Sequence, residues 1–225
     1  MQSSLPASST QYAQQLRQGF RWLRFSPALE GEYRNYCNSH EHGRVLWFCA
    51  ICLLLWGGYA LFDLWRIDAA LLDARQRALL TPLHVLRVGV AAMIVLTMLS
   101  AQRRAQVRVV QTAMVTLGVA LSCGAAFAVY VYKLLGVPHE TAILVAVMLG
   151  LFSPFAISLW VQLAMAVVYV ACVGALAWAA PVPEVGAEML RLCVELALAA
   201  LVFGFASYWR EHQRREQFLY RGDAH

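Results

Sequence analysis

Residues 141–183 decide the fold: the run TAILVAVMLGLFSPFAISLWVQLAMAVVYVACVGALAWAAPVP contains no charged side chain. A helix of about 20 apolar residues crosses the hydrocarbon core of a bilayer, so this run is long enough for two crossings. The segment FSPFAIS at 152–158 favours a turn between them, because its proline and serines interrupt a helical pattern. The run therefore predicts a membrane-embedded helical hairpin.

The rest of the chain has the same character. Hydrophobic residues make up 60% of the sequence and charged residues 14%, whereas charged residues are about a quarter of a typical soluble domain. Residues 45–62 and 109–132 also carry no charge. We therefore expect an all-α integral membrane bundle of six transmembrane helices, at about 45–64, 82–101, 109–132, 139–155, 159–180 and 187–209.

Two of these spans have distinctive ends. Thr81 and Pro82 suit the N-cap and the first helical position of the second span, because proline is well tolerated where no helical N–H bond is needed. The fourth span, at 139–155, is shorter than the others. We expect it to be less tilted than they are, or to be partly re-entrant.

Arginines are distributed unevenly between the two sides of the predicted bundle. The N-terminal segment, the loop after the second span and the C-terminal tail are rich in arginine, whereas the opposite loops are mixed or acidic. Lysine and arginine accumulate on the cytoplasmic side of membrane proteins. We therefore expect both termini in the cytoplasm, with the protein in a bacterial inner membrane. An even number of spans requires the same placement, and membrane lipids rather than nucleic acid are the expected partners.

The chain divides into three parts. Residues 1–44 form an expected cytoplasmic segment, 45–209 the membrane domain, and 210–225 a cytoplasmic exit helix. Within the first part, YAQQLRQGFRWLRF at 12–25 places apolar residues on one helical stripe beside arginines. That pattern is typical of an amphipathic helix on an anionic membrane surface, and packing against a cytoplasmic partner is almost as well supported. One or two short helices are expected between 26 and 43.

Cysteines and histidines give a weak signal for a cofactor. Five of the six cysteines lie inside apolar runs, and Cys49 and Cys52 form a CxxC pair without a second pair or a nearby histidine. Such cysteines more often serve as small packing residues. We expect no metal and no cofactor. The alternative is a small membrane redox protein that holds a metal or haem through His84 and His139.

Charges inside predicted spans are the most informative single residues, because each is costly in lipid and is usually paired or functional. Arg87 lies in the second span and Arg191 and Glu195 lie in the sixth, all toward the outer side. Arg191 and Glu195 share a helix face at i, i+4. We hypothesise a polar cavity that binds a small anionic ligand, with candidate contacts His84, Arg87, Lys133, His139, Arg191 and Glu195.

Two other interpretations of these charges remain open. Arg87 and Glu195 could form a structural ion pair that holds the second and sixth spans together, since polar pairs often join membrane helices. A small transporter is a further alternative, although the sequence shows no internal repeat and few mid-membrane breaks. No pattern for a catalytic triad, a phosphate loop or a nucleotide fingerprint is present, and no enzymatic activity is expected of this chain.

The C-terminal sequence FASYWREHQRREQFLYR, residues 205–221, contains strong helix formers and no proline. The last span can therefore continue as a rigid helix into the cytoplasm. Trp209 is expected at the membrane interface, with His212 one turn further on. Phe218 and Leu219 form a sparse apolar stripe that would suit pairing with a second copy. The alternative is a solvated tail whose arginines only fix the topology.

Two short stretches resemble a bacterial sensor pattern. RFSPALEGEYRNY at 24–36 is followed by LLLWGGYALFDLW at 53–65. Together they look like the start of the six-span, MASE-like sensor modules that precede nucleotidyl cyclase domains, chiefly GGDEF diguanylate cyclases. The similarity is carried by Phe25, Pro27, Leu29, Glu30 and Tyr33, and then by Tyr59, Phe62 and Asp63.

The resemblance implies a function without catalysis in these residues, because no GGDEF run is present in the sequence. Such a module would detect a membrane or periplasmic cue and pass it through its last helix to a cytoplasmic cyclase domain that makes cyclic di-GMP. It would act as a homodimer, because a cyclase active site of that kind is built between two copies. Signal transmission would then involve Trp209, His212, Phe218 and Leu219.

Overall fold

The computed structural model describes residues 12, 14–15, 23–38, 41–68, 70–103, 106–137, 141–153 and 157–223. These residues form helices and connecting turns, with no strand among them, so the all-α prediction is confirmed. The helices, in chain order, are α2 (Pro27–Asn38), α3 (Glu41–Arg66), α4 (Ala74–Gln102), α5 (Val107–Leu135), α6 (Ala142–Leu151), α7 (Leu159–Trp178) and α8 (Pro183–Asp223).

Five helices in the described part of the chain, α3, α4, α5, α7 and α8, are long and apolar enough to cross a membrane. The protein is therefore a multi-pass membrane protein. The expected sixth full span is not confirmed. Helix α6 has 10 residues, which gives a length of about 15 Å, half of the roughly 30 Å hydrocarbon core.

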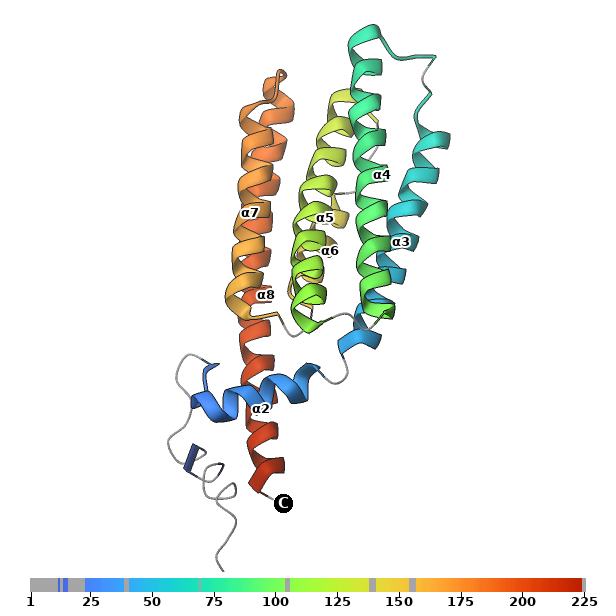
Figure 1. The fold of residues 1–225 in the computed structure, drawn as a ribbon. Coiled ribbons are helices and arrows are strands. Elements are labelled where there is room, and N and C mark those ends of the chain that lie inside the picture. The colour runs from blue at the N-terminus through green and yellow to red at the C-terminus, as the bar shows by residue number, and fades with distance from the viewer. Residues whose placement is uncertain are drawn as a thin grey trace, which may run out of the picture.

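The chain nevertheless returns along the bundle between α5 and α7. Helix α5 ends at the end of the bundle away from α2, and α7 begins at the end near α2 (Figure 1). Helix α6 is the described helix between these two ends. Pro154, in the turn predicted at 152–158, lies outside the described residues.

Helix α4 begins well before the predicted start of the second span. Its N-cap is Asp73, whose carboxylate accepts a hydrogen bond from the Gln76 backbone N–H at 2.7 Å, while the Gln76 side chain accepts one from the Asp73 N–H at 3.1 Å. This capping box satisfies two N–H groups that a helix start leaves unpaired. Thr81 and Pro82 are consequently inside the helix, and the predicted cap at Thr81 is wrong.

Helix α5 is the central element of the bundle, and it is the most buried of the five long apolar helices. Gly124 explains part of this close packing. A Cβ atom at that position would lie 3.2 Å from the Trp56 ring of α3 and 3.3 Å from Val90 of α4. The missing side chain lets α3 and α4 approach α5, as small residues do between membrane helices.

Helix α8 is one unbroken helix of 41 residues, which corresponds to about 60 Å. Its first part packs beside α7, and its second part continues beyond the bundle, where α2 lies across it (Figure 1). The prediction that the last span continues without a break into the C-terminal segment is therefore confirmed.

Helix α2 confirms the expectation of a short helix between 26 and 43. Pro27 stands at its first position, where the missing N–H costs no helical hydrogen bond. Its apolar residues Leu29 and Tyr33 are buried, together with the preceding Phe25, against Phe218 and Leu219 of α8. Of the amphipathic helix predicted at 12–25, residues 13 and 16–22 lie outside the described residues.

Candidate functional site

The structure does not assemble the predicted polar cavity. Arg87 is buried inside the bundle, with 7% of its side chain exposed, whereas the Arg191 side chain is 82% exposed and Glu195 is 45% exposed. Arg191 and Glu195 do pair with each other across one helical turn, at 3.0 Å, as their spacing predicted. They face outward, however, and do not join Arg87.

Arg87 is paired with Asp63 of α3, so the predicted pairing of Arg87 with Glu195 is wrong. Asp63 also accepts a hydrogen bond from the Tyr132 hydroxyl of α5, at 2.7 Å to Oδ2, and forms an ion pair with Arg66 at 2.7 Å. Arg87 donates a further hydrogen bond to the Tyr132 oxygen. We call Asp63, Arg66, Arg87 and Tyr132 the Asp63 cluster; it joins α3, α4 and α5.

Aromatic rings shield the Asp63 cluster from the apolar surroundings. The Arg66 guanidinium lies 4.4 Å from the centre of the Tyr132 ring, and that of Arg87 lies 5.4 Å from the Trp56 ring. Trp56 also donates a hydrogen bond to the Arg87 backbone carbonyl at 2.9 Å. Cation–π contacts of this kind are strongest where water is excluded. The cluster has two cations and one carboxylate, which leaves a net positive charge.

The remaining candidate ligand residues are dispersed. His84 is exposed, and its Nδ1 lies 2.6 Å from the Leu80 carbonyl oxygen of its own helix. Lys133 is ion-paired with Glu188, which ties α5 to α8. His139 lies outside the described residues. Among the residues that are described, no group of three or more His, Cys, Asp or Glu side chains has a geometry that could hold a metal ion.

Two of the residues proposed for signal transmission have a different environment from the one predicted. Trp209 is exposed, with its ring stacked on His212 at 6.2 Å between centres. Phe218 and Leu219, however, are 9% and 0% exposed because α2 covers them. The apolar stripe expected to pair with a second copy is thus covered by α2 of the same chain.

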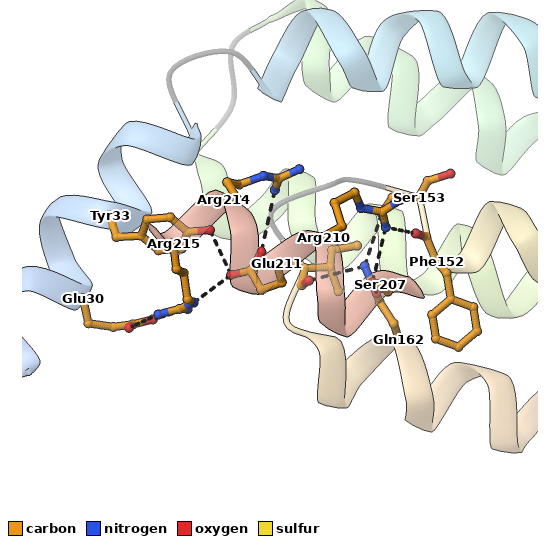
Figure 2. Close-up of polar contacts among 11 residues, drawn as sticks. Glu30, Tyr33, Phe152, Ser153, Gln162, Ser207, Arg210, Glu211, Arg214 and Arg215 are labelled. Atoms are coloured by element: carbon orange, nitrogen blue, oxygen red, sulfur yellow. Dashed lines mark hydrogen bonds and ion pairs between the residues drawn. The ribbon is translucent and has the colours of Figure 1, made fainter. Parts of the chain in front are cut away.

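A second polar cluster, the α2–α8 clamp, consists of Glu30 and Tyr33 of α2 with Glu211 and Arg215 of α8 (Figure 2). Arg215 donates to both carboxylate oxygens of Glu30, at 2.7 and 3.1 Å, and to Glu211 at 2.9 Å. The Tyr33 hydroxyl donates to Glu211 at 2.9 Å. A bidentate arginine–carboxylate contact is strong and directional, so the clamp fixes the rotation of α8 relative to α2.

Aromatic packing surrounds the clamp. The Arg215 guanidinium lies 4.4 Å from the centre of the Tyr33 ring and 4.8 Å from that of Phe25. Phe218 contacts both rings, with centres 5.3 Å from Tyr33 and 6.0 Å from Phe25. These rings cover most of the Arg215 side chain, which is 8% exposed, and the reduced access of water strengthens the attraction.

The charge state of the clamp follows from its contacts. Burial alone would raise the pKa of Glu30, but the hydrogen bonds from Arg215 and from the Phe25 backbone N–H, with the attraction of Arg215 and Arg34, hold that pKa below its ordinary value. Burial, the neighbouring Glu211 and Cys37 raise the pKa of the Tyr33 hydroxyl. At neutral pH Glu30 is therefore ionised and the Tyr33 hydroxyl is neutral.

A second set of contacts joins α8 to α7 and to the end of α6, at residues that precede the clamp in the sequence of α8 (Figure 2). The Ser207 hydroxyl donates to Gln162 of α7 at 2.9 Å, and the Gln162 amide donates to the Ser153 carbonyl at 3.2 Å. Arg210 donates to the carbonyl of Phe152 at the end of α6. Helix α8 is thus bound at two successive levels, first by α6 and α7 and then by α2.

Sequence reasoning missed both of the clusters that the structure builds. Asp63 stands at the end of the first span, and its position near the predicted depth of Arg87 is the signal that could have paired the two residues. Glu30 lies in the sensor-like stretch, where the sequence gives no sign of its partner. The Arg215 partner lies 185 residues away, and no local pattern links two positions so far apart.

No protein-family model matches the chain, and no curated protein matches it in sequence.

Proposed function

We propose that this chain is a membrane-embedded sensory or regulatory module, which passes a change in its membrane helices through α8 to a cytoplasmic output domain. The observation that carries this proposal is the continuity of α8 from Pro183 to Asp223. A helix of about 60 Å is roughly twice as long as the hydrocarbon core. Movement of its membrane part is therefore delivered beyond the lipid without a hinge.

The position of the contacts on α8 supports regulation rather than simple anchoring. Ser207 and Arg210 bind the α6–α7 end of the bundle, and Arg215 binds α2 only one to two turns later. A helix that served only as an anchor would not need a bidentate, ring-shielded ion pair after it leaves the membrane. Two sets of directional contacts define one rotation of α8, and breaking either set would permit another.

The arginine distribution supports the orientation that this function needs. Arg34 of α2, Arg103 after α4 and the arginines late in α8 belong to segments at the same end of the bundle (Figure 1). Positive charge marks the cytoplasmic side, so we place this end and both termini in the cytoplasm of a bacterium. Counting α6 as a return passage, we propose six passages in the inner membrane.

The output that we propose is a nucleotidyl cyclase, chiefly a GGDEF diguanylate cyclase, through the resemblance to MASE-like modules. Glu30 and Tyr33 of α2 and the preceding Phe25, which carry that resemblance, all contact α8. This coincidence gives the sensor-like stretch a physical role in signal transfer. A homodimer follows from the same proposal, with pairing outside the stripe that α2 covers.

The test is a fusion in which a diguanylate cyclase domain follows residue 225 and cyclic di-GMP is measured in cells. Arg215→Gln should change output by about fivefold or more, a typical size for coupling between sites. The matched control is Arg34→Gln, because Arg34 also contacts Glu30, at 3.6 Å, but is 73% exposed. Equal output from both variants and the unaltered fusion would contradict the proposal.

A further inference from the structure

A cavity lies next to the Asp63 cluster and extends along α3. Its volume is about 230 Å³, and its walls come from α3, α5 and α6, with further contributions from α4 and α7. Apolar protein cavities of roughly 150 Å³ already bind small hydrophobic molecules such as benzene. The cavity is therefore large enough to hold a ligand.

The cavity is long. Along α3 its lining residues run from Phe48 to Arg66, a separation of 18 residues that corresponds to about 27 Å. A cavity whose lining follows one helix over this distance suits an extended hydrocarbon chain better than a compact ligand.

One side of the cavity opens toward lipid. Ile51 and Leu55, which line it on α3, are 53% and 57% exposed, and Ala146 lines it on the exposed surface of α6. A molecule dissolved in the membrane can therefore enter sideways between α3 and α6 without crossing water. The shortness of α6 contributes to this opening, because a 10-residue helix covers only part of the length of α3.

The far end of the cavity is polar and positively charged. Arg66, Arg87 and Tyr132 all line it, whereas Asp63 does not. The only carboxylate of the Asp63 cluster thus lies behind the two guanidinium groups when they are viewed from the cavity. In addition, the Nε atom of Arg87 is buried and has no hydrogen-bond partner among the described residues. This end is suited to accept an anion.

We propose that this cavity binds a long-chain carboxylic acid of the free fatty acid class. The carboxylate would lie against Arg66 and Arg87, and the hydrocarbon chain would lie along the groove between α3 and α6. Sites of this kind combine apolar walls with a few fixed polar groups that set the orientation of the ligand. The site differs from the predicted cavity, since neither Arg191 nor Glu195 belongs to it, and it does not depend on α8 carrying a signal.

The test uses the full chain in nanodiscs of phosphatidylcholine, with a dibrominated stearic acid as the probe. Trp56 lines the cavity, so bromine atoms in the chain should quench its fluorescence. The same titration with a Trp56→Phe variant measures the quenching of the other tryptophans. Subtracting it leaves the quenching of Trp56 alone. We expect saturable quenching by the acid, and at least about tenfold weaker binding of its methyl ester, which lacks the charge that the arginines recognise.

Two variants with the same substitution separate the cavity from the general lipid surface. Ala146→Phe should fill the groove and abolish the quenching, while Ala142→Phe, at an exposed position of α6 outside the cavity lining, should leave it unchanged. Because both alanines are exposed, neither change disturbs the core. Thermal melting of both variants checks that they are folded.

Three results would overturn the proposal. Equal quenching by the acid and by its methyl ester would exclude recognition of the carboxylate. Equal quenching by a brominated phosphatidylcholine would show that ordinary lipid chains fill the groove. Quenching that survives Ala146→Phe would place the acid elsewhere. None of these measurements uses an output domain, so their failure is distinguishable from failure of the proposed sensory function.

Discussion

Arg215 of α8 holds Glu30 of α2 through two hydrogen bonds, of 2.7 and 3.1 Å, although 185 residues separate them in the chain. The side chains are 8% and 19% exposed, and the Tyr33 and Phe25 rings lie beside the guanidinium. The contact joins the first described helix of the chain to the last. It ties the position of α8 to that of α2.

Loss of the Arg215 charge should release α2. Charge-assisted hydrogen bonds contribute roughly 1.5–3 kcal/mol, so Arg215→Gln should lower the hydrogen-exchange protection of α2 amides by about tenfold or more. Arg34→Gln should change that protection by less than about twofold, because an exposed ion pair contributes little. Unchanged protection of α2 in Arg215→Gln would mean that aromatic packing alone holds the two helices together.

The clamp should respond to acid in one direction. Because the pKa of Glu30 in the folded protein lies below the ordinary value of 4.5, its contribution is fully present above that value and is lost as the pH falls through the lowered pKa. Spin labels at the exposed positions Asn35 and Gln213 should therefore report a constant distance from pH 7 to about 5 and a longer one in stronger acid. In Glu30→Gln the distance should no longer respond to this titration.

The aromatic part of the clamp should be separable from its charge. Phe218→Ala removes ring contacts with Phe25 and Tyr33, and truncating a buried phenylalanine costs about 3–5 kcal/mol in a well-packed core. We expect α2 to lose most of its protection from limited proteolysis. Phe205→Ala, where the ring is 71% exposed, is the matched control and should leave α2 protected.

Neutralising Asp63 should destabilise the membrane bundle. Asp63→Asn leaves Arg66 and Arg87 without a carboxylate, and removal of one partner from a buried ion pair typically costs about 3–5 kcal/mol. The melting temperature in detergent should fall markedly, and Arg87→Gln in the same chain should restore part of it. Arg191→Gln, at an 82% exposed side chain, should cost less than about 0.5 kcal/mol. A similar loss from Asp63→Asn and Arg191→Gln would contradict a structural role for the cluster.

Local patterns were sufficient for much of this fold. Apolar runs of membrane length identified α3, α4, α5, α7 and α8, since a helix is the only isolated segment that satisfies its own backbone in lipid. The continuation of α8 was predictable from helix formers without proline. The start of α4 was not, because the capping box at Asp73 and Gln76 outweighs the preference of Pro82 for a first position.

The partners of the charged residues could not be predicted in the same way. Depth along a helix placed Arg87 near the outer end, but the face of the helix, and therefore its neighbour, depends on how the bundle packs. Arg87 faces α3 and finds Asp63, whereas Arg191 and Glu195 face outward and find each other. Hydropathy constrains the depth of a residue in the membrane, and it carries no information about which helices are adjacent.

The contact between α2 and α8 also imposes an order on biosynthesis. Glu30 leaves the ribosome long before Arg215, and 185 intervening residues take roughly 10–40 s at about 5–20 residues per second. The Arg215 partner of Glu30 is therefore made only after α3 to α7 have been synthesised, and this ion pair is among the last contacts of the fold that can form.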